Sequence, residues 1–149
     1  MGVHEISLCE FCEPRGQFPG SAVAWHFLMS DARQTLGKMG EDLACDELQR
    51  RGYAILARRY RRRGGELDIV ARDGQTIVFV EVKTREGCEF GAGAESVTRF
   101  KRRRMANVAL DFLARHQLTE SPCRFDVVSI DIGVAKPKIE LYQNAFDVG

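Results

Sequence analysis

Two carboxylates and a lysine stand on neighbouring apolar segments of this 149-residue chain. Asp68 lies within the run GELDIVARDG, and Glu81 and Lys83 lie within the run VFVEVKTR. Residues two apart on a strand point to the same side of a sheet, so Glu81 and Lys83 share a face, while the valines that alternate with them face a core. Carboxylates held close together repel one another, and a bound divalent cation is the simplest reason to gather them.

A tight turn joins the two runs. Asp73-Gly74 favours a two-residue type I′ hairpin loop. With that loop, Asp68 lies opposite Phe79 and Glu66 lies opposite Glu81. The three acids and Lys83 then share one face, with Asp68 and Glu81 as diagonal neighbours. The alternative interpretation is a solvated strand face with ordinary cross-strand ion pairs.

These runs resemble the catalytic core of the PD-(D/E)xK nuclease superfamily, which has a restriction-endonuclease-like fold. More closely, GELDIVARDG followed by VFVEVKTR is similar to the YraN family of small bacterial proteins, over about residues 36–146. The resemblance makes Asp68 the lone Asp, Glu81 the acid and Lys83 the Lys of the motif. Leu67 stands where the superfamily usually has Pro, a small departure because that Pro only stiffens the entry to the strand.

The resemblance implies a metal-dependent nuclease. Asp68 and Glu81 would hold Mg²⁺ or Mn²⁺, with the main-chain carbonyl of Val82 as a third oxygen ligand. The ion would lower the pKa of a bound water and polarise the scissile phosphate. Lys83 would orient or deprotonate that water, or stabilise the charge that develops on the phosphate. Glu66 would complete or outline the site.

A helix is expected before the strands, over Asp31–Arg51, opened by Ser30 or Asp31 and ended by Gly52. Glu41 falls in line with an apolar row of this helix, where a carboxylate is costly unless something pairs with it. In the related archaeal Holliday-junction resolvases a first-helix Glu reaches the metal site, so the resemblance implies the same role for Glu41. The alternative is an acid of the first turns, favoured by the helix dipole.

The remaining elements complete one domain. We expect a strand at Tyr53–Ala57, a basic loop at 58–65, the two acid-bearing strands, a helix from Ser96 to about His116, and strands at Phe125–Ile130 and Ile139–Tyr142. The order α-β-β-β-α-β-β predicts an α/β sandwich in which helices flank a mixed central sheet. The resemblance implies the same restriction-endonuclease-like architecture. Residues 1–30 lack sustained periodicity and are expected to be a flexible tail before a domain at 31–149.

Basic residues gather around Tyr60 and around Phe100, although the net charge is only +1. Such clusters bind phosphates, and the alternative is a solvated face. Phe100 itself is expected to face the core. The residues expected to contact nucleic acid are Arg61, Arg62, Arg63, Lys101 and Arg104.

Composition limits the function further. The chain has no run of about 18 apolar residues, so we expect no transmembrane helix. Five scattered cysteines favour a reducing cytoplasm. We expect a cytoplasmic protein that binds nucleic acid, with DNA preferred over RNA, and a homodimer is left open. Three classes of function remain: a metal-dependent nuclease acting on DNA, including branched DNA; a non-catalytic nucleic-acid-binding module of the same fold; and a protein-interaction adaptor.

Overall fold

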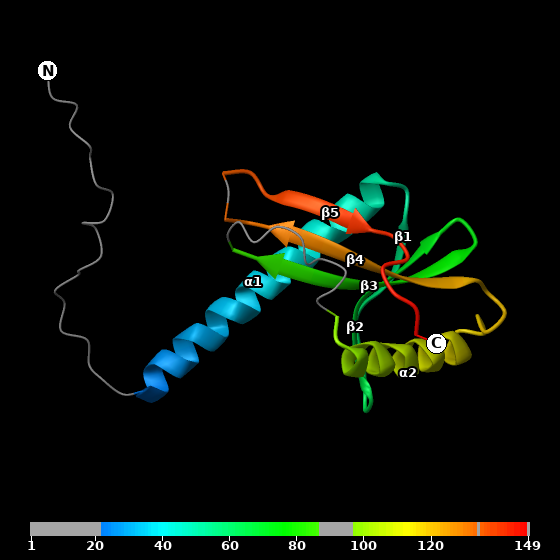
Figure 1. Ribbon diagram of the computed structural model, residues 1–149, viewed down its shortest axis with the longest axis horizontal. Coiled ribbons are helices and arrows are strands. Elements are labelled where there is room, and N and C mark those ends of the chain that lie inside the picture. Colours follow the sequence, from blue (N-terminus) through cyan, green and yellow to red (C-terminus); the bar gives the residue numbers. More distant parts are fainter. Residues whose placement is uncertain (1–21, 87–96, 134, 149) are drawn as a thin grey trace, which may run out of the picture.

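A five-stranded sheet lies between two helices (Figure 1). The computed structural model describes residues 22–86, 97–133 and 135–148, with side chains from residue 30 onward. In chain order the elements are α1 (Ala22–Arg50), β1 (Ala54–Arg62), β2 (Gly65–Asp73), β3 (Thr76–Arg85), α2 (Arg99–Arg115), β4 (Cys123–Asp131) and β5 (Lys138–Tyr142). The predicted α/β class and the order α-β-β-β-α-β-β are confirmed.

The sheet is mixed, as predicted. Its strands lie in the order β1-β2-β3-β4-β5, and only β3 and β4 are parallel, with Phe79 level with Phe125. Parallel neighbours need a crossover connection, and here that crossover contains α2. The other neighbours are antiparallel. The two acid-bearing strands are therefore central strands, and a helix covers each face of the sheet.

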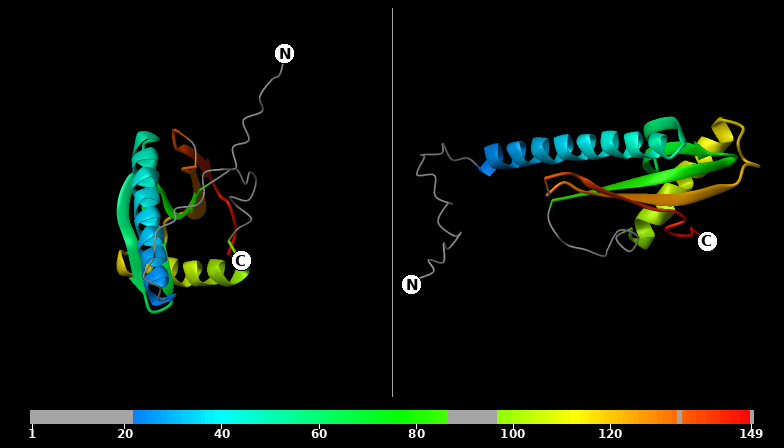
Figure 2. Two further views of the ribbon diagram at one scale, coloured as in Figure 1. Left: turned by 90° about the vertical axis from the view of Figure 1, so that its left-hand side faces the viewer. Right: turned by 90° about the horizontal axis from the view of Figure 1, so that it is seen from above.

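The helices lie on opposite faces of the sheet (Figure 2), and each face carries its own core. On the α2 side, Phe79 and Phe112 are almost fully buried, with their rings edge to face at 6.2 Å. On the α1 side, Leu48 packs with Val80. Burying apolar residues on both faces explains why β3 reads as a nearly continuous apolar run. Glu81 is the charged exception within that run.

Helix α1 begins at Ala22, earlier than the predicted Asp31. It ends as predicted before Gly52, whose φ of +90° suits glycine after a helix. At Gly40 the helix approaches β3 so closely that a Cβ there would lie 1.9 Å from Oγ1 of Thr84. This close approach fixes the neighbouring Glu41 beside the sheet. Of the predicted tail at residues 1–30, residues 22–30 belong to α1, and residues 1–21 lie outside the described residues.

The predicted basic loop at 58–65 is wrong, because most of it belongs to β1. Tyr60 pairs with Leu67 of β2, and only a short turn at Arg63 and Gly64 separates the two strands. The Tyr60 ring packs edge to face on Phe112 at 5.1 Å. Long arginine side chains on an edge strand keep their charges in water, so a basic segment is compatible with a strand.

The start of α2 also differs from prediction. Thr98, not Ser96, caps the helix, and its hydroxyl accepts the N–H of Lys101 at 3.3 Å. Ser96 lies outside the described residues. Phe100 is 71% exposed instead of facing the core. In the described part of the chain, no helix is long and apolar enough to cross a membrane.

Candidate active site

The turn between β2 and β3 decides which residues face each other. Its loop consists of Gly74 and Gln75, one residue later than predicted. Gly74 has a φ of +59° and Gln75 does not have a positive φ, which is typical of a type II′ turn. Phe79 therefore lies opposite Val70 and not opposite Asp68. The register shifts by two residues, so the paired residues, Ile69–Asp73 and Thr76–Val80, keep their predicted faces.

Asp68 lies where β2 and β3 stop pairing. The last pair on this side is Ile69 with Val80, and Asp68 is the next residue outward. Its Oδ2 accepts the main-chain N–H of Val82 at 2.9 Å. This hydrogen bond satisfies a β3 donor that β2 no longer reaches. The carboxylate is thus anchored against β3 directly beside Glu81.

Strand β2 changes faces at this level. Ile69 packs in the α1-side core and Leu67 in the α2-side core, although residues two apart in a regular strand share a face. On the neighbouring strand, Arg59 lies level with Asp68 and has a φ of +51°. The pairing of β1 with β2 is continuous at this level, because its register shift lies between Ile55 and Ala57, so Arg59 is not part of a bulge. The change of face and the left-handed residue occur together beside Asp68.

Glu81 is almost completely buried, with 2% of its surface exposed. Two ammonium groups contact its Oε1. Nζ of Lys83, two residues along the same face of β3, lies at 3.1 Å, and Nζ of Lys101, from the first turn of α2, forms the closer ion pair. Lys101 was expected to contact phosphates, but the structure places its charge at the carboxylates.

The pKa of Asp68 is raised from an ordinary 3.8 to about 7. Burial is the main cause, because it disfavours the ionised form, and the negative charge of Glu81 is the second. The N–H of Val82 and the charge of Lys101 act in the opposite direction. The pair of carboxylates therefore carries a repulsion that a proton or a cation relieves.

Glu41 and Glu66 lie close to this pair, but each is bound to an arginine. Oε2 of Glu41 accepts Nε of Arg59 at 2.6 Å. The carboxylate of Glu66 accepts two bonds from Arg61, at 2.8 and 3.3 Å. The predicted pairing of Glu66 with Glu81 is wrong, since the pairing of β2 with β3 ends at Ile69 and Val80 and does not reach Glu66. On its other side, Glu66 lies opposite Arg61 of β1.

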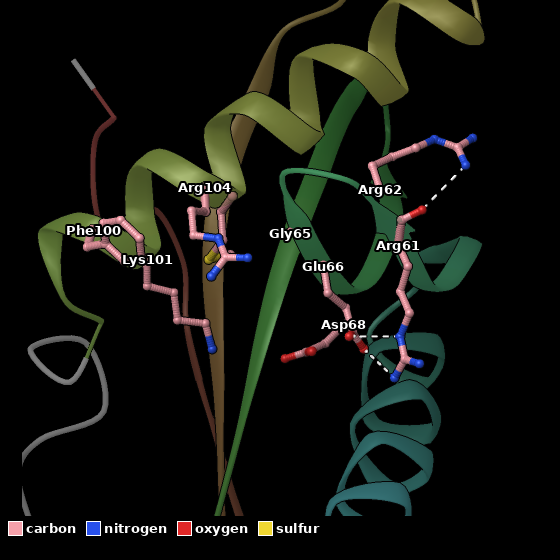
Figure 3. Close-up of a pocket in the computed structure, with 9 residues that line it drawn as sticks. Arg61, Arg62, Gly65, Glu66, Asp68, Phe100, Lys101 and Arg104 are labelled. Carbon is pink, nitrogen blue, oxygen red and sulfur yellow. Dashed lines mark hydrogen bonds and ion pairs between the residues drawn. The ribbon is translucent and has the colours of Figure 1, made fainter.

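Two hollows open onto the carboxylates. The α1 hollow, of about 400 Å³, is lined by residues that include Glu41, Asp68, Glu81, Val82, Lys83 and Lys101. The α2 hollow, of about 730 Å³, is lined by residues that include Arg61, Glu66, Asp68, Phe100, Lys101 and Arg104 (Figure 3). Asp68 and Lys101 line both, so the two hollows meet at these side chains. Four of the five residues predicted to hold a metal thus lie around the α1 hollow, and Glu66 lies along the other.

The site offers a divalent cation a small set of oxygen donors. Within the described residues, no three His, Cys, Asp or Glu side chains are arranged around one ion. Asp68 and Glu81 offer carboxylate oxygens beside the main chain of Val82. Mg²⁺ is commonly held by one or two carboxylates and fills its remaining positions with water and substrate phosphate oxygens. The pair fits such an ion on this basis.

The predicted nucleic-acid-binding arginines differ in their surroundings. Arg61 is paired with Glu66, and Nε of Arg62 donates to Asp111 at 3.0 Å. Arg63 is exposed at the β1–β2 turn. Nε of Arg104 donates to the carbonyl of Gly64 at 2.9 Å, which ties α2 to that turn. Arg61, Arg62 and Arg104 all line the α2 hollow.

Sequence reasoning missed three features of the site. These are the exposure of Phe100, the ion pair of Lys101 with Glu81 and the ion pair of Arg59 with Glu41. Helical spacing carried a signal for Lys101, which lies four residues before the buried Met105 and so on the inward face of α2. No comparable signal marks Arg59.

The fold and site define an α/β sandwich in which a half-buried Asp, a buried Glu and a lysine lie where two central strands part. The chain belongs to a family described as "Uncharacterised protein family UPF0102", the YraN family, whose model matches residues 40–130. That range includes Glu41, Asp68, Glu81, Lys83 and Lys101. The predicted family is confirmed.

Full-length relatives agree with this assignment. A UPF0102 protein of Geobacter metallireducens is 48% identical over 120 residues, covering 80% of this chain and 98% of the relative. A UPF0102 protein of Geobacter sulfurreducens is 47% identical over 120 residues, covering 80% of this chain and 94% of the relative. A third UPF0102 protein, from Symbiobacterium thermophilum, is 46% identical over 112 residues, covering 74% of this chain and 95% of the relative.

Proposed function

We propose that this protein is a Mg²⁺- or Mn²⁺-dependent endonuclease that hydrolyses phosphodiester bonds in DNA. The observation that carries the proposal is the pair of half-buried Asp68 and buried Glu81, with Nζ of Lys83 at 3.1 Å from Oε1 of Glu81. The site combines two mutually repelling carboxylates, a lysine and an adjoining basic hollow. Phosphate chemistry uses this combination, and a solvated strand face does not need it.

The two acids would bind the cation, and the Val82 carbonyl would add a third oxygen ligand. When bound, a divalent ion supplies a water of lowered pKa and a positive charge at the scissile phosphate. Asp68 must lose its proton for this, so ion binding is expected to strengthen as the pH rises through about 7. The N–H of Val82 holds Asp68 in place throughout.

Lys83 and Lys101 would supply the protein's own positive charge at the reacting phosphate. Lys83 is positioned by β3 and is a candidate to orient the attacking water or to stabilise charge that develops in the transition state. Lys101 binds Glu81 from α2 and lies at the junction of the two hollows. A cation bound by Glu81 would compete with this ion pair and release Lys101 toward the substrate.

The α2 hollow would hold the DNA backbone. Arg61, Arg62 and Arg104 line it, and Arg63 is exposed on the adjoining turn. Arginine suits phosphate oxygens because its planar guanidinium presents several donors in a fixed geometry. Phosphate contacts carry no sequence information, so we expect little sequence preference.

The test uses the purified full chain and three variants. The variants are Glu81→Gln, Lys83→Ala and the exposed-site control Glu120→Gln. Each protein is incubated with single-stranded, duplex, flapped and four-way DNA and with RNA, in Mg²⁺, Mn²⁺ or EDTA. We expect metal-dependent cleavage by wild type and the control and none by Glu81→Gln. Lys83→Ala should bind the ion, as measured by calorimetry, and lose about 10²- to 10⁴-fold in rate.

Each contrary result has a distinct meaning. Equal cleavage by Glu81→Gln would identify a contaminating nuclease. DNA binding by wild type without cleavage of any substrate would favour the non-catalytic binding module. Neither binding nor cleavage would leave the protein-interaction adaptor.

A further inference from the structure

Phe100 is a large aromatic side chain held on the solvent side of α2. Its surface is 71% exposed, and it precedes Lys101, whose ammonium group reaches Glu81. The buried face of α2 continues from Met105 back to Lys101, four residues earlier, and Phe100 lies outside that face. Its ring therefore does not serve the core.

Arg104 lies against this ring and is itself fixed. The guanidinium carbon of Arg104 is 5.6 Å from the centroid of the Phe100 ring. Its Nε donates to the carbonyl of Gly64 in the β1–β2 turn. One part of the ring is thus flanked by a cation anchored to another element, and most of the remaining surface is open to solvent. Aromatic rings beside arginines are the components of single-stranded nucleic-acid sites.

The ring also lies between two basic hollows. It lines the α2 hollow together with Asp68, and it lines a further hollow of about 610 Å³ with Arg99, Arg102, Arg103, Asp147 and Val148. Both volumes fall within the range of about 300–1,000 Å³ typical of sites for small ligands. Figure 3 shows Phe100 at the start of α2, on the same side of the hollow as Lys101 and Arg104.

Single exposed apolar residues are ordinary, and Leu110, 65% exposed on the same helix, is one. Phe100 differs because it lines one hollow with Asp68 and a second with three arginines, and because its ring lies beside the guanidinium of Arg104. A polymer whose phosphates contact those arginines would bring its bases to this ring. Bases within a duplex are already stacked on their neighbours, so only an unpaired or extruded base has a face available for stacking.

We infer that Phe100 is a stacking platform for an unpaired nucleobase next to the phosphate that is cleaved. The inference rests on the proposed function and names its substrate class: single strands, or duplexes and junctions with an unpaired nucleotide at the cleavage point. Stacking reads only the face of a base, so little preference among the four bases is expected.

The experiment measures binding in EDTA, so it does not depend on cleavage. Wild type, Phe100→Ala, Phe100→Trp and the control Leu110→Ala are titrated against fluorescein-labelled single-stranded DNA, single-stranded RNA and duplex DNA of one length. A second set of single strands carries 2-aminopurine, whose fluorescence falls when the base stacks. Light scattering measures the oligomeric state of each variant, and circular dichroism measures its folding.

We expect Phe100→Ala to weaken single-strand binding by about 5- to 150-fold, the usual effect of losing one stacked base, and to change duplex binding little. Phe100→Trp and Leu110→Ala should bind as wild type does, and 2-aminopurine should be quenched by wild type and not by Phe100→Ala. Equal losses on single strands and duplex, or no loss on single strands, would overturn the inference. A change from dimer to monomer with unchanged affinity would overturn it too, because Phe100 would then be a contact between copies of the chain.

These outcomes separate the inference from the nuclease proposal. Binding that needs Phe100 without cleavage in Mg²⁺ or Mn²⁺ keeps Phe100 as a stacking platform for an unpaired base and rejects the nuclease, together with the placement beside a cleaved phosphate. Cleavage that does not change in Phe100→Ala keeps the nuclease and rejects the stacking platform. Absence of binding by wild type to every oligonucleotide would reject both.

Discussion

Asp68→Asn is expected to stabilise the protein at pH 8 and to leave its stability nearly unchanged at pH 4. In the folded protein the pKa of Asp68 is about 7, against an ordinary value of 3.8. Between these values the folded chain keeps a proton that the unfolded chain has lost. The stabilising contribution of protonated Asp68 is therefore complete below about pH 4 and is lost as the pH rises through about 7.

The size of the effect follows from linkage. A difference between pKa values of 3.8 and about 7 corresponds to a loss on the order of 4 kcal/mol across this pH range. Asparagine imitates the protonated acid, because its oxygen can accept the N–H of Val82 and its amide can donate to Glu81. The variant should avoid this loss and exceed wild type in melting temperature by roughly 10 °C at pH 8.

The assay is thermal unfolding of wild type, Asp68→Asn and the exposed control Glu120→Gln from pH 4 to pH 8 in EDTA. The difference between Asp68→Asn and wild type isolates one carboxyl, since the other groups titrate in both proteins. Adding Mg²⁺ or Mn²⁺ at pH 8 should then raise the melting temperature of wild type and not that of Asp68→Asn. A difference that does not vary with pH, or a variant less stable than wild type at pH 8, would refute the reasoning.

Three further predictions concern packing, charge and the first residues. Gly40→Ala should destabilise the protein by about 1–3 kcal/mol in chemical denaturation, because the new Cβ meets Oγ1 of Thr84, and adding Thr84→Ala should recover part of the loss. Arg63→Ala should reduce the slope of log K for DNA binding against log salt concentration by about 1. Arg62→Ala should reduce this slope less, because the Arg62 side chain is already paired with Asp111. Equal effects of the two variants would contradict the prediction. A chain that starts at Met29 should melt within a few degrees of the full chain, because residues 31–35 are exposed; a larger fall would show that the first segment stabilises the domain.

Where the two central strands pair with each other, their faces could be predicted from sequence, and their register could not. Alternation depends only on the two-residue period of a strand, and the loop position does not affect it when the register shifts by two. The register depends on which residues form the turn. Asp73-Gly74 and Gly74-Gln75 are both acceptable loops, with type I′ and type II′ geometry respectively. The first was predicted, and the chain adopts the second.

The irregularity beside Asp68 had no sequence signal. Left-handed backbone is usually marked by glycine or asparagine, but here Arg59 adopts it. Its ion pair with Glu41, across 18 positions of the chain, is one contact that accompanies this conformation. Such long-range contacts are invisible to a reading based on neighbouring residues. Glu41 could be predicted to approach the site from the resemblance. Its partner Arg59 could not be predicted, because their contact is long-range.

The two helices explain how the sheet tolerates an unfavourable pair of acids at its centre. On one side, Gly40 lets α1 pack closely against Thr84 of β3, and on the other, Met105 of α2 is almost fully buried in the second core. Packing on both faces holds β3 in place where its pairing with β2 ends, so Asp68 and Glu81 cannot relieve their repulsion by moving apart. Under the proposed function, a bound cation would restore the stability given up at these two carboxyls. The pH dependence of Asp68→Asn and its response to Mg²⁺ therefore test the same feature.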